Sequence, residues 1–131
     1  MKLGYVILYV PDVASTVAFY ERAFGLSARF VHEAGQYAEM ETGATALAFA
    51  AEAMVAGFGH AFRAQRPGES PAGAEVAFVT DDVAAAYATA LAAGAAAYEA
   101  PHAKPWGQTV SYVRDLNGFL VEICSPLSPT G

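Results

Sequence analysis

Cysteine, charged residues and histidine are all scarce in this sequence of 131 residues. Its one cysteine, Cys124, excludes an intrachain disulfide and a cysteine-based zinc cluster, and we expect an inert core thiol. Charged residues make up 15% of the chain and hydrophobic residues 55%, an apolar balance that indicates a subunit interface. The net charge of −6 argues against nucleic acid as a partner and favours a cationic ligand.

Long hydrophobic runs are also missing. No apolar stretch approaches the length of a membrane span, so no membrane partner is expected. The first residues, Met1 to Leu3, lead directly into an apparent strand without the pattern of a signal peptide. From these two absences we expect a cytoplasmic protein.

The first half of the chain combines one helix with several short strands. Residues 3–10 are rich in β-forming side chains and end at Pro11. Asp12 is a good N-cap, and an apolar stripe at helical spacing follows it as far as Gly25, a typical helix terminator. Three short strands are predicted next, over residues 28–32, 36–41 and 44–50. The predicted order is therefore β-α-β-β-β.

Residues 52–73 interrupt this pattern with four glycines and two prolines, which predicts a linker whose first residues could form a helical turn. The second half then repeats the first. A strand at 75–80 precedes a helix that begins at Asp81 or Asp82 and ends at Gly94, and further strands are predicted at 95–99, 109–114 and 119–124. Two modules, 1–51 and 74–131, are expected to form one domain together.

The repeat can be followed position by position. A shift of 70 residues places Asp12 on Asp82, and a shift of 75 residues places Gly43 on Gly118. The segments VPDVASTVAFYERAFG (10–25) and RDLNGFLVE (114–122) resemble the vicinal oxygen chelate superfamily, which includes glyoxalase I, extradiol dioxygenases and bleomycin resistance proteins. This resemblance implies an α+β fold in which two β-α-β-β-β repeats form curved mixed sheets around a cavity. It also implies a homodimer, because subunits of that superfamily often pair. It specifies the activity poorly, because one scaffold hosts many functions.

Metal-using members of that superfamily place four ligands on the first and last strands of the two repeats. The matching positions here are Tyr5, Leu47, Glu75 and Glu122, and none of them is a histidine. A catalytic metal typically needs three ligands of the histidine or carboxylate type. We therefore expect no metal and no cofactor. The alternative is a divalent metal ion held by Glu75 and Glu122.

The two glutamates have other possible roles. The resemblance makes their strands neighbours, and side chains opposite each other on one face lie ~5 Å apart. Glu75 and Glu122 could share a proton and act as a general acid/base. They could instead bind a cationic ligand, or Glu75 could point outward as an ordinary surface residue.

Aromatic and apolar side chains supply the other candidates. Trp106, the only tryptophan, lies in a Pro/Gly loop (104–108) and is expected to form a pocket wall, with the plugging of a barrel end as the alternative. Alternation places Tyr5, Ile7 and Tyr9 on one strand face, and places Leu47 and Phe49 on another. Together they suit a planar or amphipathic ligand, with plain core packing as the alternative. The predicted ligand-binding set is Trp106, Tyr5, Ile7, Tyr9, Leu47, Phe49, Glu75 and Glu122.

Two functions follow from these residues. The first is a metal-free small-molecule-binding protein, without catalytic residues, that sequesters an amphipathic or cationic compound. The second is a metal-dependent glyoxalase-like lyase or isomerase, or a dioxygenase, that uses Glu75 and Glu122. The sequence leaves open whether the protein is an enzyme, and it favours the binding protein.

Overall fold

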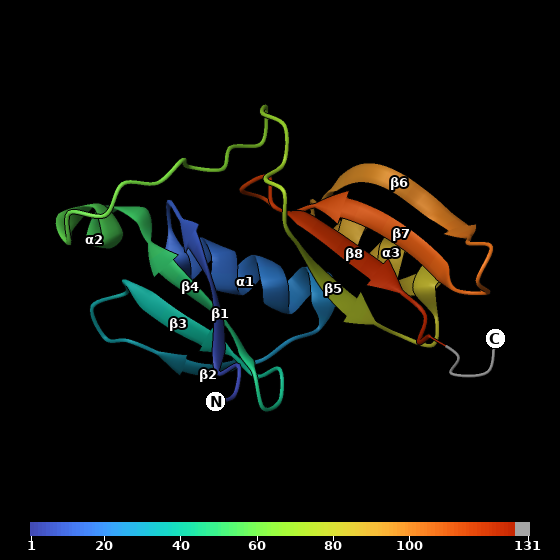
Figure 1. The fold of residues 1–131 in the computed structure, drawn as a ribbon, viewed down its shortest axis with the longest axis horizontal. Coiled ribbons are helices and arrows are strands. Elements are labelled where there is room, and N and C mark those ends of the chain that lie inside the picture. Colours follow the sequence, from blue (N-terminus) through green and yellow to red (C-terminus); the bar gives the residue numbers. More distant parts are fainter. Residues whose placement is uncertain (128–131) are drawn as a thin grey trace. The chain divides into compact units, whose positions relative to one another are not determined.

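Two compact units make up the chain. The computed structural model describes residues 1–127, and the chain divides into unit 1, Met1–Gln65, and unit 2, Arg66–Gly131 (Figure 1). The boundary between them lies inside the segment 52–73 that the sequence marks as a linker. No helix within residues 1–127 is both long enough and apolar enough to cross a membrane.

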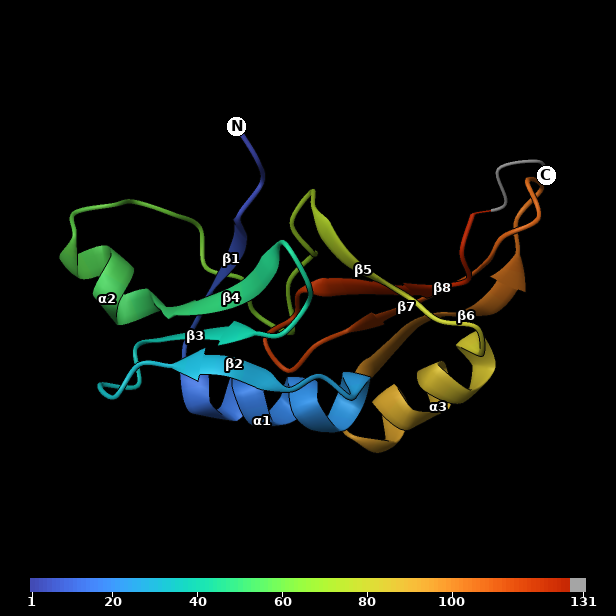
Figure 2. The same cartoon turned by 90° about the horizontal axis from the view of Figure 1, so that it is seen from below.

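Unit 1 is a mixed four-stranded sheet with a helix against one face. Its strands run in the order β1-β4-β3-β2, with β1 parallel to β4 and the other pairs antiparallel. Helix α1 lies along one face of this sheet (Figure 2). The elements are β1 (Tyr5–Val10), α1 (Val13–Phe24), β2 (Ala28–Val31), β3 (Tyr37–Met40), β4 (Ala46–Ala51) and α2 (Glu52–Gly57).

Helix α1 begins and ends where the sequence predicts. The Asp12 carboxylate accepts a hydrogen bond from the Ser15 amide at 2.9 Å, which satisfies a free N–H of the first turn. Gly25 ends the helix with φ +69°, a left-handed conformation that glycine adopts without strain. Between these ends, the side chains that face the sheet are buried: Val13, Thr16, Val17, Phe19, Tyr20 and Ala23.

Unit 2 repeats this architecture, and the predicted fold is thereby confirmed. Its strand order is β5-β8-β7-β6, with β5 parallel to β8. Asp82 begins its helix by accepting a hydrogen bond from the Ala85 amide at 3.1 Å, as Asp12 does in unit 1. The elements are β5 (Glu75–Val79), α3 (Val83–Ala92), β6 (Ala96–Ala103), β7 (Thr109–Arg114) and β8 (Leu120–Cys124).

Strand β6 is longer than expected. The sequence predicts an end at Glu99, whereas the strand continues to Ala103 through Pro101. Because β6 is an edge strand, the missing N–H of Pro101 can face away from the sheet and need not remove a ladder hydrogen bond. Register shifts between Ala97 and His102 accompany this irregular path.

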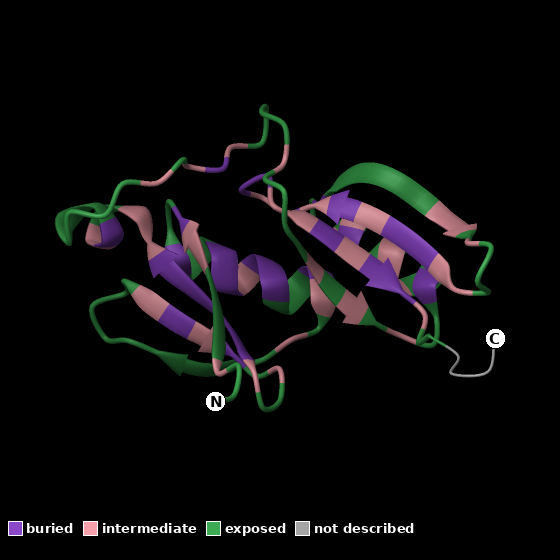
Figure 3. Ribbon diagram, viewed as in Figure 1, coloured by how far each residue is buried: buried purple, intermediate pink, exposed green. Residues whose placement is uncertain are grey.

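In each unit a long helix, α1 or α3, covers one face of the sheet, and the opposite face is called the open face. In unit 2 the covered face holds the fully buried pairs Ser111–Ile123 and Val113–Val121, while β5 alternates between exposed and half-buried residues (Figure 3). In unit 1 the central strand β4 is buried over Ala46–Ala50 on both faces. On the face opposite α1, helix α2 and the segment after it lie over Ala50 and form the site described next.

Candidate small-molecule site

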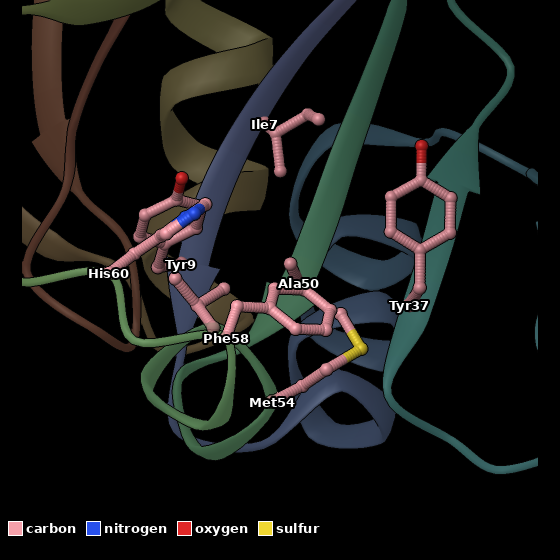
Figure 4. Close-up of a pocket in the computed structure, with 8 residues that line it drawn as sticks. Ile7, Tyr9, Tyr37, Ala50, Met54, Phe58 and His60 are labelled. Atoms are coloured by element: carbon pink, nitrogen blue, oxygen red, sulfur yellow. The ribbon is translucent and has the colours of Figure 1, made fainter.

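A pocket of about 200 Å³ lies on the open face of the unit 1 sheet, opposite α1. Figure 4 shows Tyr37 on one side of it and Tyr9 with His60 on the other, with Phe58 and Met54 near one end. Nearly all of the lining is apolar or aromatic, which suits an apolar or planar group. The lining residues are Ile7, Tyr9, Tyr37, Ala50, Met54, Val55, Phe58 and His60.

Three strands and one short helix position these side chains. Tyr9 and Tyr37 both pair with Ala50 of the strand between them, so the small alanine forms a floor flanked by two phenol rings. Helix α2 follows β4 directly and folds Met54 and Val55 over this floor. The segment after α2 adds Phe58 and His60, whose rings meet edge to face at 6.0 Å.

The structure separates the aromatic residues that the sequence groups together. Ile7 and Tyr9 line the pocket, whereas Tyr5 shares their face of β1 but lies outside it, with 56% of its surface exposed. Phe49 packs at 4.8 Å from the Tyr20 ring of α1, so it faces the helix, and Leu47 shares that face by alternation. The expectation that Leu47 and Phe49 line the cavity is therefore corrected: both are core residues beneath the helix.

The strand register also corrects the counterpart of Glu122. Tyr5 pairs with Ala46, and the matching residue Glu75 pairs with Leu120. Counting along the strands makes Ala48, and not Leu47, the unit 1 counterpart of Glu122. Both turns hold five residues, 41–45 before β4 and 115–119 before β8, but Gly43 lies three residues before β4 and Gly118 only two before β8. An ungapped shift that aligns the two glycines therefore displaces the strands by one residue.

Glu39 is a candidate residue that the sequence reasoning missed. It lies half-buried on β3, and its Oε2 accepts a hydrogen bond from the Tyr37 hydroxyl at 2.9 Å. Burial, followed by this hydrogen bond and the nearby charge, raises the pKa of Tyr37 to about 12, so the phenol keeps its proton. The sequence could have indicated Glu39, because Tyr37 and Glu39 alternate with the apolar residues Ala38 and Met40. In the structure Ala38 and Met40 are fully buried.

The open face of unit 2 carries the predicted pair of glutamates. Glu75 is opposite Leu120 and Glu122 is opposite Ala77, so the two carboxyl groups are diagonal neighbours rather than directly opposite. They still meet: a hydrogen bond with Glu122, reinforced by burial and by the charge of Glu122, raises the pKa of Glu75 to about 7. Tyr112 pairs with Glu122 across β7 and β8, and burial, followed by the charges of Glu122 and Glu75, raises its pKa to about 12.

The residue types at the superfamily's four ligand positions do not fit a metal ion. Unit 2 offers the carboxylates of Glu75 and Glu122, whereas the corresponding positions of unit 1 hold Tyr5 and Ala48. Ala48 has no donor atom, so the set falls short of three histidine or carboxylate ligands. Within residues 1–127, no group of three or more His, Cys, Asp or Glu side chains could hold a metal ion.

Trp106 lies in the turn between β6 and β7 of unit 2 and does not line the pocket of unit 1. Its indole Nε1 donates a hydrogen bond to Gln108 Oε1 at 2.9 Å, and the Lys104 ammonium lies 5.8 Å from the ring centre. About half of its surface, 51%, is exposed. The loop is ordered by its own contacts, because the Lys104 amide also donates to the Gln108 carbonyl at 2.8 Å.

The sequence matches the family described as Glyoxalase/Bleomycin resistance protein/Dioxygenase superfamily over residues 2–123. The chain belongs to this superfamily. Among curated proteins, none matches the sequence.

Several solved structures share this fold. A glyoxalase-related enzyme from Fulvimarina pelagi is 21% identical with a TM-score of 0.81, over 96% of this chain and 88% of that one. A glyoxalase/bleomycin resistance protein/dioxygenase family enzyme from Burkholderia phytofirmans is 20% identical with a TM-score of 0.75, over 95% and 98%. TioX from Micromonospora sp. is 25% identical with a TM-score of 0.71, also over 95% and 98%.

Proposed function

We propose that this superfamily member is a small-molecule-binding protein that sequesters an amphipathic or cationic compound without a catalytic metal. The observation that supports this proposal is the pocket of about 200 Å³ on the open face of the unit 1 sheet. Its walls are aromatic and aliphatic, and its Met54 thioether can adapt to an aromatic surface. Such walls bind by burial and stacking rather than by reaction.

The volume limits what the pocket takes. A cavity of ~150 Å³ lined by apolar side chains is large enough for benzene, whereas whole drug-sized ligands occupy roughly 300–1,000 Å³. A pocket of about 200 Å³ therefore holds one ring system. The remainder of a larger ligand would extend over the rim.

The lining also favours binding over catalysis. Its ionisable side chains are Tyr9, Tyr37 and His60. Tyr37 keeps its proton, since its pKa is raised to about 12. His60 contacts the ring of Phe58, and the lining provides no serine, cysteine or carboxylate for it to activate.

A thermal-shift screen of aromatic ammonium compounds, with Ala50→Leu as the test variant, checks this proposal. The added atoms fill the floor between Tyr9 and Tyr37, so compounds that raise the melting temperature of the wild type should lose at least tenfold in affinity for the variant. The matched control is Ala44→Leu, an exposed site outside the pocket. Hits that bind Ala50→Leu as tightly as the wild type would show that they do not use this pocket.

The glutamate pair of unit 2 favours a second function. Two carboxyl groups that share a proton, with the pKa of Glu75 at about 7, suit general acid/base catalysis near neutral pH. This second candidate is a glyoxalase-like isomerase or lyase, or a dioxygenase. In its metal-dependent form, Glu75 and Glu122 would have to hold a divalent ion with solvent or substrate oxygens.

Elemental analysis and one variant separate the two candidates. Protein purified without chelator and then incubated with Ni²⁺, Mn²⁺, Fe²⁺ or Zn²⁺ should retain less than stoichiometric metal if the binding function is correct. Stoichiometric metal that Glu122→Gln abolishes would instead support the metal enzyme. Turnover in glyoxalase or ring-cleavage assays that Glu122→Gln eliminates, without loss of the folded circular-dichroism spectrum, would support catalysis by the pair.

A further inference from the structure

Glu39 places a carboxylate at the edge of the pocket. Tyr37 lines the pocket, and its hydroxyl lies 2.9 Å from Glu39 Oε2. Glu39 also pairs across the sheet with Ala48, which in turn pairs with the lining residue Ile7. The row Ile7–Ala48–Glu39 therefore runs across the strands beside the row Tyr9–Ala50–Tyr37, on the same open face. The first row ends in the carboxylate of Glu39.

No lysine or arginine within residues 1–127 forms a salt bridge with this carboxylate, although the nearby charge of Glu39 contributes to the raised pKa of Arg29. Arg29, on the neighbouring strand β2, is bound elsewhere: its Nε donates to Glu41 at 2.6 Å, and its Nη2 donates to Glu41 and to the Gly43 carbonyl at 3.1 and 2.6 Å. In the described part of the chain, the Tyr37 hydroxyl is the one hydrogen-bond donor to the Glu39 side chain, and no lysine or arginine pairs with it. A carboxylate accepts up to about four hydrogen bonds, so Glu39 retains free acceptor sites.

We infer that the unit 1 pocket binds an aromatic ammonium compound, with its ring between Tyr9 and Tyr37 and its ammonium group against the Glu39 carboxylate. This inference rests on the proposed binding function and specifies the ligand class for that site. Tyr37 then has two roles, since its ring forms a wall and its hydroxyl orients the carboxylate.

The polarity of the site distinguishes the ammonium from other head groups. An anionic group beside the ring would face the Glu39 carboxylate, with Arg29 already committed to Glu41 and Gly43. A neutral hydroxyl would gain one hydrogen bond without charge assistance. An ammonium group gains a charge-assisted hydrogen bond, which is roughly twice as strong as a neutral one.

Three naphthalene derivatives that differ only in the head group test this inference. They are 1-naphthylmethylamine, 1-naphthalenemethanol and 1-naphthoate, titrated against the full chain by isothermal calorimetry and by naphthalene fluorescence. The amine should bind the wild type about tenfold more tightly than the alcohol, and the carboxylate should bind most weakly. Glu39→Gln should reduce the preference for the amine to less than about twofold while leaving affinity for the alcohol unchanged.

Glu21→Gln is the matched control, because it makes the same change in net charge on α1, which lies against the opposite face of the sheet. Glu21→Gln should retain the tenfold preference for the amine. If net charge alone attracted the amine, Glu21→Gln and Glu39→Gln would reduce the preference equally. Equal binding of amine and alcohol to the wild type, or a preference that survives Glu39→Gln, would overturn the ligand class and leave the proposed binding function standing. Absence of binding by all three compounds would overturn both.

Discussion

Glu75 couples the stability of unit 2 to pH. Its pKa is raised from 4.5 to about 7 in the folded chain, first by the hydrogen bond with Glu122 and then by burial. The folded state therefore favours the protonated carboxyl group. The stabilisation is complete below the unfolded pKa of 4.5 and is lost as the pH rises through about 7.

Glu75→Gln removes this dependence, because the amide stays neutral at every pH. The shift corresponds to at most ~3 kcal/mol, which solvent screening of an exposed side chain reduces to about 1 kcal/mol. Urea unfolding should show the variant more stable than the wild type by that amount at pH 8, with the difference vanishing toward pH 4.5. Glu69→Gln, an exposed residue of the same unit, controls for net charge, and an equal gain there would refute the role of the pair.

Alternation along a strand predicts which residues share a face, but not which face that is. Ile7 and Tyr9 share a face of the edge strand β1, and both line the pocket. Strand β4 alternates small and large residues, with Ala46, Ala48 and Ala50 on one face and Leu47 and Phe49 on the other, and all five are buried, so the sequence does not show which face the helix covers. The assignment of Leu47 and Phe49 to the open face fails for that reason.

The turns between strands were predictable from glycine, but their contacts were not. In the turn from β7 to β8, Gly118 has φ +95°, and the Asp115 carboxylate accepts from the Asn117 and Phe119 amides at 2.8 and 2.9 Å. The Gly118 carbonyl accepts from Arg114 Nε at 2.9 Å. A Cβ added at Gly118 would lie 2.5 Å from the carbonyl oxygen of Arg66.

Gly118→Ala should therefore destabilise the chain through both backbone strain and steric overlap. The corresponding turn residue, Gly43, has nearly the same φ of +94°, but a Cβ there meets nothing within 4 Å. Gly43→Ala measures the strain alone, so denaturant unfolding should show Gly118→Ala less stable than Gly43→Ala by about 1–3 kcal/mol. Equal losses in the two variants would mean that the Arg66 backbone moves aside without cost.

At the scale of the molecule, the internal repeat was visible in the sequence because both helices begin with a capping aspartate. Asp12 and Asp82 stand 70 residues apart, and each accepts a hydrogen bond from the amide three residues later. The pocket was not visible in the same way. It depends on α2 and the segment to His60 folding over the unit 1 sheet, and those residues have the glycine-rich composition of a linker.

The two edges of the unit 1 sheet differ in their protection against further strand pairing. Strand β2 carries Arg29, which is paired with Glu41, and its register shifts between Ala28 and Phe30. Charges and irregular register are the usual means by which edge strands avoid association. Strand β1 has no charged residue, no proline and no register shift from Tyr5 to Val10, and its exposed side chains include Val6 at 39% and Ile7 at 44%.

The unprotected edge predicts a homodimer that associates through β1, since symmetric pairs are the commonest soluble oligomers. Size-exclusion chromatography with light scattering should give the wild type a mass of twice the 13.6 kDa of one chain. Val6→Lys should shift the mass to that of one chain, because a lysine on an edge strand opposes pairing. Val31→Lys makes the same substitution on the protected edge and should remain dimeric. Dissociation by Val31→Lys alone would place the interface on β2, and a monomeric wild type at about 100 µM, above the Kd expected of a specific dimer, would rule the dimer out.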